Sequence, residues 1–341
     1  MQAPSAFLGL FCVSIIPILL VIDSEPDQRE ALPGSNQPWL GFERLYEFLT
    51  ARRDLIMAQT ARAAHFNWFW RMDPQIEMIH GSAEWPVHFY RSQITELAQA
   101  GDALGLHAHA FRWDQAAARW INDYGNPAWI ESCLRRSFAA YRSVFGRDCT
   151  LFRFGDGWFD EAIIPTLEAL GARIDLTIEP GVPRRQKLVD CELATGCLPD
   201  RRGAPRQPYQ PAYTDFRRRD ASGRTQLWAL PVSTAPRMKS PRWYRPARWL
   251  QWWRSPKRRL HQFNLEISPK RFPYLFERVL QTTAPSYAAI CVRSDAGLSD
   301  DRLSVAGRNL AVIQQHPLAE RFRFMTADEA LLELTRARRR C

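Results

Sequence analysis

Two histidines separated by a single residue, His107 and His109, have the spacing that points most directly to chemistry. If the chain is extended there, residues i and i+2 point to the same side, so both imidazoles can face one metal ion. Asp23, Glu25 and Asp27 form an acidic cluster directly after an apolar stretch. A carboxylate with two imidazoles is a common ligand set for zinc and other divalent ions. The combination favours a metal site, although two loop histidines bonded to the backbone would have the same local sequence.

Further ionisable residues follow other stretches that we predict to be strands. In parallel α/β sheets and barrels, functional residues gather at the carboxyl ends of the strands. We therefore expect one site to draw on these groups: Asp23, Glu25 and Asp27; Asp73; His107 and His109; Arg153 and Asp156; Asp175 and Glu179; Arg293 and Asp295. Arg153 either pairs with an acid for structural reasons or orients a catalytic carboxylate. Asp160 precedes a predicted helix and is expected to cap it.

The predicted elements determine where these residues lie. Apolar runs predict strands at 15–22, 64–70, 103–106, 150–154, 174–178, 227–231, 288–292 and 321–325. Apolar spacings of three and four predict helices at 39–51, 87–100, 127–145, 160–170, 274–281, 303–315 and 327–338. Strands and helices alternate at least six times. This alternation indicates right-handed βαβ units and a parallel sheet, either closed as a barrel or open and doubly wound.

The stretch 6–22 is an uncharged run of 17 residues. That length suits a signal-peptide core and barely suffices to span a bilayer. No Lys or Arg precedes the run and no clear small-x-small site follows it, which disfavours a cleaved signal. Residues 15–22 are continuously apolar and end in acidic residues, as a buried parallel strand does. We expect a strand at 15–22 after an apolar leader at 1–14, with a membrane anchor as the alternative.

The positive charge of the chain is concentrated in one segment. The net charge is +10, but nine Lys and Arg and no acidic residue lie between Arg237 and Arg259, and without them it would be +1. A nucleic-acid-binding protein normally has a basic surface over a whole domain, so we do not expect nucleic acid as a partner. The seven cysteines include no CxxC pair, which favours free thiols in a reducing compartment and a cytoplasmic protein.

The same basic segment contains four tryptophans: Trp243, Trp249, Trp252 and Trp253. Three interpretations are open. The indole rings could stack on sugar rings while the arginines pair with acidic sugars or phosphates. They could instead lie at a membrane surface, with the arginines on anionic lipid, which would make the protein membrane-associated. The third interpretation is a solvated insertion without either role.

Taken in order, these motifs resemble those of the polysaccharide deacetylase family, also called the NodB-homology group or carbohydrate esterase family four. The first motif is the strand followed by Asp23 and Glu25. The stretch GDALGLHAH at 101–109 is similar to the family's GHEIG-x-H block. Arg153, within FRFG, lies where the third motif has an arginine, and Asp175 opens DLTIEPG, which is similar to the fourth.

The resemblance implies a distorted (β/α)7 barrel of the TIM-like type over 15–335, with insertions at 183–225 and 236–262. It also implies hydrolysis of an N- or O-acetyl group on a sugar. One Asp and two His would hold a divalent metal, and a second Asp would act as the base.

Several family positions can be matched to this sequence. Asp23 matches the base, and His107 matches the first metal histidine. The family's metal Asp is Ser24 here, so Glu25 or Asp73 would have to take its place.

Two other family roles are displaced or missing. The second metal histidine falls at Phe111, and His109 is the nearest replacement. The late catalytic histidine has no counterpart at 292–295, where Arg293 could contact the oxyanion or the substrate. An arginine stays protonated near neutral pH and cannot act as a general acid.

We predict a metal-dependent deacetylase that acts on a carbohydrate. A divalent metal, expected to be zinc, would lie on His107, His109 and a carboxylate, and Arg153 would orient Asp23. The predicted substrate contacts are Asp175, Trp249, Trp252 and Trp253. The alternative is a catalytically silent protein of the same fold that binds a glycan or a membrane surface. A nucleotide-binding protein is disfavoured because the sequence has neither GxGxxG nor GxxxxGK followed by Ser or Thr.

Overall fold

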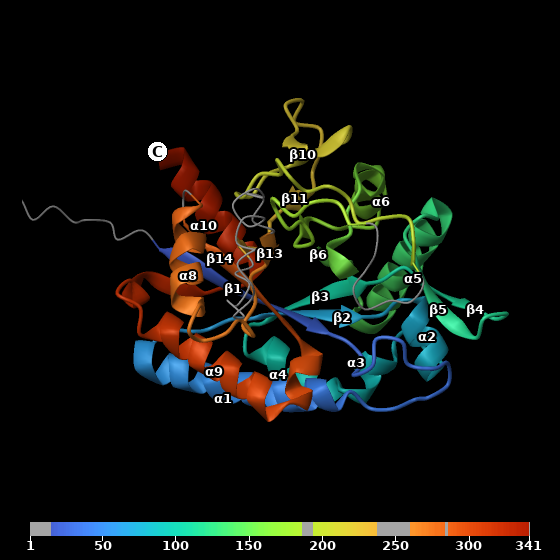
Figure 1. Ribbon diagram of the computed structural model, residues 1–341, viewed down its shortest axis with the longest axis horizontal. Coiled ribbons are helices and arrows are strands. Elements are labelled where there is room, and N and C mark those ends of the chain that lie inside the picture. The colour runs from blue at the N-terminus through green and yellow to red at the C-terminus, as the bar shows by residue number, and fades with distance from the viewer. Residues whose placement is uncertain (1–14, 186–193, 237–259, 284–285, 341) are drawn as a thin grey trace, which may run out of the picture.

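The computed structural model describes residues 15–185, 194–236, 260–283 and 286–340, and a curled sheet of parallel strands lies at its centre (Figure 1). Along the sheet the strands follow the order β11-β7-β6-β3-β2-β1-β14, and β15 pairs with β1. The strands are β1 (Ile16–Ser24), β2 (Asn67–Arg71), β3 (Ala103–Ala108), β6 (Leu151–Phe154), β7 (Ile174–Asp175), β11 (Trp228–Ala229), β14 (Ala288–Arg293) and β15 (Phe322–Phe324). All of these pairs are parallel, which confirms the predicted distorted (β/α)7 barrel.

The barrel is distorted where its two edge strands approach each other. No ladder joins β11 to β14 among the described residues; the stretch 230–233 connects them instead. Val232 N donates to Ile178 O, and Ser233 N donates to Ala289 O, both at 3.0 Å. Ala289 N in turn donates to the Ser233 hydroxyl oxygen at 3.0 Å. The backbone of this segment therefore closes the barrel without forming a regular strand.

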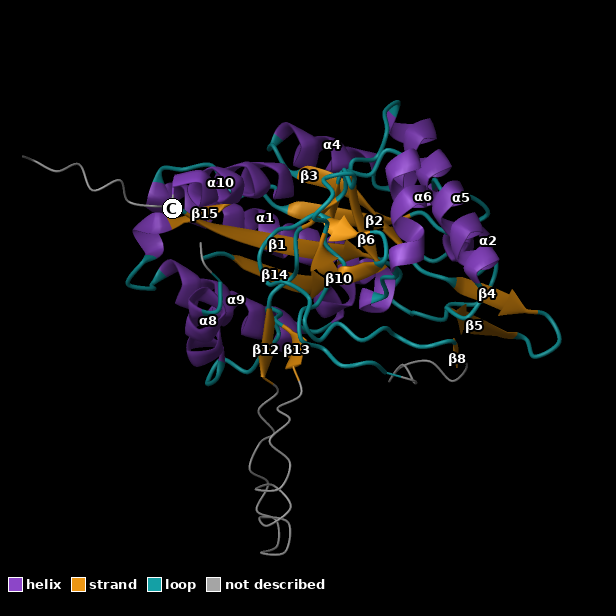
Figure 2. Ribbon diagram, turned by 90° about the horizontal axis from the view of Figure 1, so that it is seen from above, coloured by secondary structure: helices purple, strands orange, loops and turns teal. Residues whose placement is uncertain are grey.

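Helices surround the sheet on its outer side (Figures 1 and 2). They are α1 (Leu40–Thr60), α2 (Pro74–His80), α3 (Trp85–Phe89), α4 (Arg91–Gln99), α5 (Pro127–Phe145), α6 (Ile164–Ala169), α8 (Phe272–Gln281), α9 (Asp300–Gln314) and α10 (Ala327–Arg340). In Figure 1, α1 and α9 lie together below the sheet, while α5 and α6 lie on the side of β6.

The strands separate two apolar clusters, because successive side chains point to opposite faces. On β1, Ile18, Leu20 and Ile22 belong to the large cluster that also contains the buried residues of the helices. Leu19 and Val21 belong to a smaller cluster formed by residues of β1, β2, β6, β7 and β14, with α10 at one end. The smaller cluster is therefore the interior of the barrel.

Helix α5 has the bounds that the sequence predicts. The Asn126 side chain caps its first turn by accepting a hydrogen bond from Trp129 N at 3.1 Å, and Pro127 follows the cap. Gly146 ends the helix with a φ of 64°, a conformation that glycine adopts without strain.

Two other predicted helices are interrupted. The helix predicted at 87–100 is split into α3 and α4, because Tyr90 between them has non-helical backbone angles. The Tyr90 hydroxyl oxygen is fixed there by a hydrogen bond from Trp39 N at 2.6 Å. The helix predicted at 160–170 begins as a 3-10 turn, Glu161–Ile163, before α6.

Two acidic residues have capping roles. Asp27 accepts hydrogen bonds from Leu40 N at 2.9 Å and Gly41 N at 2.8 Å, at the start of α1. Asp160 accepts from Ala162 N at 2.9 Å, which confirms the cap expected there. Neither carboxylate is then available for chemistry.

Short strands occur outside the barrel sheet, in antiparallel pairs except for the parallel pair of β5 and β8. A hairpin of β4 (Phe111–Asp114) and β5 (Arg119–Asp123), which the sequence analysis does not predict, follows β3, and β8 (Ala194–Thr195) pairs with β5. Within 183–225, β9 (Pro211–Ala212) pairs with β10 (Asp215–Arg219). The strands β12 (Thr234–Pro236) and β13 (Leu260–Gln262) also pair. Residues 237–259 between them, with Trp249, Trp252 and Trp253, lie outside the described residues.

Residues 15–22, whose sequence suits a strand or a membrane anchor, form most of β1, and every residue of β1 is buried. The leader predicted at 1–14 lies outside the described residues. Within the described part of the chain, no helix combines the length and the apolar character needed to cross a membrane.

Candidate active site

Charged residues replace apolar ones on the inner face of the barrel near the carboxyl ends of the strands. On β1 the inward series Leu19 and Val21 continues with Asp23 and then, just beyond the strand, Glu25. The same alternation places one ionisable residue on the inner side of each neighbouring strand: Arg71 on β2, His107 on β3, Arg153 on β6 and Arg293 on β14. Arg71, His107 and Arg153 are register partners across three strands, and Asp23 is the register partner of Arg293.

Except for Arg71, these side chains line a cleft with a volume of about 260 Å³. The cleft also includes residues from loops and from the β12–β13 ribbon: Arg29, His109, Asp156, Gly157, Glu179, Arg185, Leu198, His261, Gln262 and Asn264. The predicted strand-end residues from β1, β3, β6 and β14 therefore do come together at one site.

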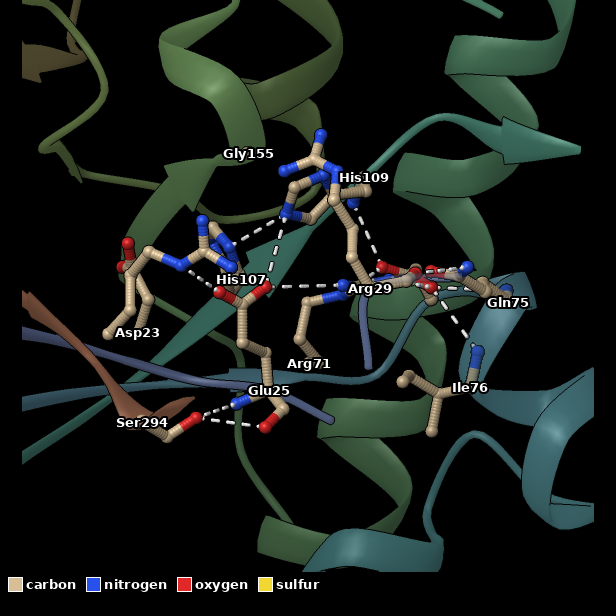
Figure 3. A network of polar contacts seen from close by, with 12 residues as sticks. Asp23, Glu25, Arg29, Arg71, Gln75, Ile76, His107, His109, Gly155 and Ser294 are labelled. Carbon is tan, nitrogen blue, oxygen red and sulfur yellow. Dashed lines mark hydrogen bonds and ion pairs between the residues drawn. The ribbon is translucent and has the colours of Figure 1, made fainter. Parts of the chain in front are cut away.

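Glu25, His107 and His109 form a compact group whose possible ligand atoms all lie within 4.8 Å of one another (Figure 3). The Nε2 atoms of the two histidines are 3.1 Å apart, and His109 Nε2 is 3.7 Å from Glu25 Oε2. Two atoms bound to a tetrahedral zinc at about 2.0 Å lie about 3.3 Å from each other. The observed separations thus fit a shared divalent ion with little movement.

A hydrogen bond orients the His107 ring, and an ion-pair contact with a carboxylate lies beside the His109 ring. His107 Nδ1 is 3.0 Å from the Arg153 carbonyl oxygen, which can only accept, so Nδ1 carries the proton and Nε2 faces the cluster with its lone pair. His109 Nδ1 lies 3.5 Å from Asp156 Oδ2, and the Phe111 ring stacks on the His109 ring at a centroid distance of 5.5 Å. A backbone carbonyl and a carboxylate are the usual partners of metal-binding histidines.

The charge states of the group also suit a cation. Burial lowers the pKa of His107 and, together with the Arg71 charge, holds the pKa of His109 well below its usual value. Burial acts to raise the pKa of Glu25, but Arg293, the two histidines and Arg71 together outweigh it and lower that pKa. The group therefore presents two neutral imidazoles and one carboxylate, the forms that bind metal.

Glu25 is held from two sides. Arg293 Nε forms an ion pair with its Oε1 at 2.8 Å, and Arg71 Nη1 lies 3.6 Å from its Oε2. Its backbone exchanges hydrogen bonds with Ser294: Glu25 N donates to Oγ at 3.0 Å, and Oγ donates to Glu25 O at 2.8 Å. These contacts place Glu25, and not Asp73, in the group with the two histidines.

Asp23 is paired with Arg153 inside the barrel. Arg153 Nε donates to Asp23 Oδ1 at 2.7 Å, and Arg153 Nη1 donates to the Leu176 carbonyl oxygen at 2.5 Å. Both side chains are nearly excluded from solvent, at 3% and 7% exposure. Among the described residues no group hydrogen-bonds to Asp23 Oδ2, so that oxygen is available to accept a proton.

Asp156 joins the site although the sequence analysis gives it no role beyond its place at a strand end. It forms an ion pair with Arg29 at 2.5 Å and accepts hydrogen bonds at 2.8 Å from Asn122 Nδ2 and the Tyr124 hydroxyl. Burial acts to raise the pKa of Asp156, but the Arg29 charge and the contact with His109 outweigh it and hold the pKa well below its usual value. This ionised carboxylate contacts His109 at Nδ1 and so helps to fix the orientation of the ring.

Four of the strand-end residues expected at the site, Asp27, Asp73, Asp175 and Asp295, are not part of the cleft lining. Asp73 caps α2: its oxygens accept from Gln75 N at 3.0 Å, from Arg71 Nε at 2.6 Å and from His109 N at 2.9 Å. Asp73 thus positions two members of the site without belonging to the metal-type group. Its carboxylate is already occupied by these donors.

Asp175, predicted to contact substrate, lies on the opposite face of the sheet. Its register partner is Phe152, which packs in the outer cluster, whereas Ile174 and Leu176 beside it belong to the interior. Both Asp175 oxygens accept hydrogen bonds from Thr177, at 2.9 Å from N and 2.7 Å from Oγ1. Asp175 is fully buried, and its position in this structure gives it no contact with the cleft.

Gly155 is required for the position of His109, because a Cβ at this residue would overlap the His109 ring. The two are labelled side by side in Figure 3.

The β12–β13 ribbon crosses the carboxyl end of β7 and supplies residues that the sequence analysis misses. Thr234 Oγ1 donates to Pro180 O at 2.7 Å, and Gln262 Nε2 donates to Glu179 Oε1 at 3.1 Å. As a result His261 lines the cleft. The cleft therefore contains a third imidazole, that of His261, although 292–295 include no histidine.

Comparisons with known proteins identify the fold. No protein-family model and no curated protein matches the chain. A solved structure assigned as a glycoside hydrolase/deacetylase from Parabacteroides distasonis aligns with a TM-score of 0.53 and 9% identity, over 95% of this chain and 71% of that one. A structure assigned as a polysaccharide deacetylase from Pseudomonas aeruginosa PAO1 aligns with a TM-score of 0.50 and 12% identity, over 94% and 92% of the two chains. At these identities the likeness shows that the chain shares the fold of these proteins.

Proposed function

We propose that this protein is a metal-dependent hydrolase that removes an acetyl group, N- or O-linked, from a sugar of a polysaccharide or glycoconjugate. The observation that carries the proposal is the Glu25, His107 and His109 group placed beside the Asp23–Arg153 pair in one cleft. The assigned polysaccharide deacetylase and glycoside hydrolase/deacetylase among the proteins of this fold support the choice of reaction and of substrate class.

A divalent cation, with zinc as the first candidate, would be held by His107 Nε2, His109 Nε2 and a Glu25 oxygen. The donor set, two imidazoles and a carboxylate, is one that zinc adopts in hydrolytic enzymes. Such a cation polarises a carbonyl group and lowers the pKa of water, which is the chemistry that acyl hydrolysis needs. Arg153 O and Asp156 fix the two rings so that both Nε2 atoms face the same point.

Asp23 is the proposed general base. Arg153 holds Oδ1 of Asp23 at 2.7 Å, which leaves Oδ2 to accept the proton of the attacking water. Arg153 contacts no other carboxylate at ion-pair distance among the described residues, so its function is to orient Asp23. Replacement of Asp23 by Asn should lower the rate by about 10²–10⁴-fold.

Arg293 is placed to stabilise negative charge on the carbonyl oxygen of the substrate. Its side chain is 34% exposed to the cleft and lies 2.8 Å from Glu25 Oε1. A fixed positive charge in a partly desolvated site favours a developing oxyanion. Because an arginine retains its proton near neutral pH, Arg293 contributes charge and no proton. Trp249, Trp252 and Trp253 remain predicted sugar contacts, with a membrane surface as the other partner that the basic segment could bind.

The test is elemental analysis of the purified wild-type chain beside His107→Ala and His109→Ala. The exposed His88 on α3 pairs with Glu84 and lies outside the cleft, so His88→Ala is the matched control. We expect about one zinc per chain in the wild type and in His88→Ala, and little in the two site variants.

Hydrolysis of N- and O-acetylated sugars by the same four proteins then tests the reaction. Activity that disappears together with the metal supports the proposal. Failure of the wild type to retain any divalent metal after supplementation refutes it, and the catalytically silent glycan- or membrane-binding protein becomes the better interpretation.

A further inference from the structure

Among the described residues, the cleft and the arginine that pairs with it from outside contain one more cation than carboxylate. Its lining includes four arginines and four carboxylates. Each of the carboxylates already has an arginine partner: Asp23 with Arg153 at 2.7 Å, Glu25 with Arg293 at 2.8 Å, Asp156 with Arg29 at 2.5 Å, and Glu179 with Arg201 at 3.4 Å. Since Arg201 comes from outside the lining, Arg185 is the cleft arginine that no carboxylate neutralises among the described residues.

Arg185 is held in place by its backbone. Its N donates to Leu198 O at 3.1 Å, and its O accepts from Leu198 N at 2.9 Å, which forms an antiparallel bridge. Leu198 itself is buried. A charged side chain on a fixed backbone loses less conformational freedom when it binds a ligand than one on a mobile loop.

The side chain of Arg185 reaches His261 on β13, where Nη2 lies 3.4 Å from Nδ1. A guanidinium group can only donate, so His261 Nδ1 accepts and the ring proton lies on Nε2. When His261 accepts this hydrogen bond at Nδ1, its ring proton on Nε2 is a second donor group beside the guanidinium. Two donors at one side of a cleft, one of them cationic, form a site for an anion.

We propose that Arg185 and His261 bind an anionic group of the substrate, a sugar carboxylate or a phosphate ester. The proposal deepens the proposed function, on which it rests for the sugar nature of the ligand. A divalent ion on Glu25, His107 and His109 would add two positive charges to a cleft that already has one in excess. An acidic sugar compensates this charge, whereas a neutral sugar leaves Arg185 without a counter-charge in a partly desolvated site.

The experiment is calorimetric titration of the full-length protein with glucuronate, glucose 6-phosphate and glucose. It compares the wild type with Arg185→Gln and His261→Gln. Arg184→Gln is the matched control, because Arg184 is the adjacent arginine, carries the same charge, is exposed and contacts Cys197 Sγ at 3.1 Å. Metal content and thermal unfolding are measured on every preparation, and Arg185→Lys, which keeps the charge, serves if Arg185→Gln does not fold.

We expect the wild type to bind at least one of the two anionic sugars about tenfold or more tightly than glucose, as a charge-assisted hydrogen bond allows. Arg185→Gln should remove this preference, His261→Gln should reduce it, and Arg184→Gln should retain it. Preference for glucuronate identifies a carboxylate, and preference for glucose 6-phosphate identifies a phosphate ester.

Equal affinity for the three sugars, or an equal loss in Arg184→Gln, overturns the proposal. Its failure is distinguishable from failure of the metal site. A chain that retains zinc without any charge preference keeps the proposed hydrolase and loses the anion subsite. A chain without metal that still requires Arg185 for anionic sugars keeps the subsite and loses the hydrolase.

Discussion

Replacement of one partner of the Asp23–Arg153 pair should have a large effect on stability, whereas replacement of both should have a small one. The two side chains are almost fully buried, and Arg153→Met leaves both Asp23 and the Leu176 carbonyl without their donor. Removal of one partner from a buried pair costs about 3–5 kcal/mol of unfolding free energy. Asp23→Leu should cost a similar amount, because it leaves a buried guanidinium uncompensated.

The double variant Asp23→Leu/Arg153→Met should lose less than either single variant, because apolar residues in place of a buried ion pair are often neutral or stabilising. Urea unfolding of the wild type and the three variants gives the coupling energy. Arg135→Met removes an exposed pair with Glu131 on α5 and should cost less than about 1 kcal/mol.

Additive losses in the Asp23–Arg153 cycle, or a single-variant loss no larger than that of Arg135→Met, would refute the view that the two charges are coupled and buried. A double variant that folds as well as the wild type and yet no longer hydrolyses acetylated sugars would show that the Asp23–Arg153 pair is needed for catalysis and not for the stability of the fold.

Three further predictions concern residues around the site. Burial raises the pKa of Asp175 to about 7, so the folded state retains a proton that the unfolded chain releases from about pH 4. Its contribution to stability therefore falls as pH rises, and the unfolding free energy of the wild type, measured against Asp175→Asn, should drop by about 2–3 kcal/mol between pH 5 and pH 8; a flat difference contradicts this assignment. Gly155→Ala should displace His109 and lower the zinc content, whereas Gly307→Ala on α9, where the nearest atom is the end of the flexible Arg52 side chain at 3.0 Å, should not; equal zinc content in both would contradict the steric argument. Zinc at 100 times its Kd should stabilise the wild type by about 2.7 kcal/mol in thermal unfolding, and a matching gain in His109→Ala would place the ion elsewhere.

The sequence predicts the barrel well where one strong local signal determines each element. The apolar run at 15–22 forms β1 because a strand at the centre of a parallel barrel is buried on both faces, and α5 has a cap, a following proline and a terminal glycine at its ends. Interruptions depend on contacts between distant residues. Tyr90 breaks the predicted helix at 87–100 where Trp39, far away in the chain, donates to its hydroxyl.

Asp175 shows a different limit of prediction. Its place after an apolar run suggested a strand end facing the site, but β7 has only two residues, and the face that a residue occupies depends on the register with β6. A shift of one residue moves every side chain to the other face of a sheet.

The sequence predicts those site residues whose position follows from the alternation of side chains along a strand. His107, His109, Asp23 and Glu25 follow the period of two from their strands, and the structure brings all four to the cleft. Arg71 obeys the same rule, but the strand predicted at 64–70 ends one residue before it. Asp156 was expected at the site only from its place after a strand, and His261 had no local signal; a left-handed turn at Asp156 and the antiparallel β12–β13 ribbon bring the two residues to the cleft.

The contrast between the two ends of the barrel argues for a functional site. At one end the interior is apolar, with Leu19, Val21 and Cys291 in one cluster with residues of α10, while at the other end the same strands present charges. Burying these charges requires that each be paired, and apolar residues of similar volume would stabilise the fold equally well or better. Stability alone therefore does not account for the charged end. Two neutral imidazoles beside an ionised glutamate, with Asp23 held by Arg153, form an arrangement in which a cation and a proton acceptor can act on one substrate.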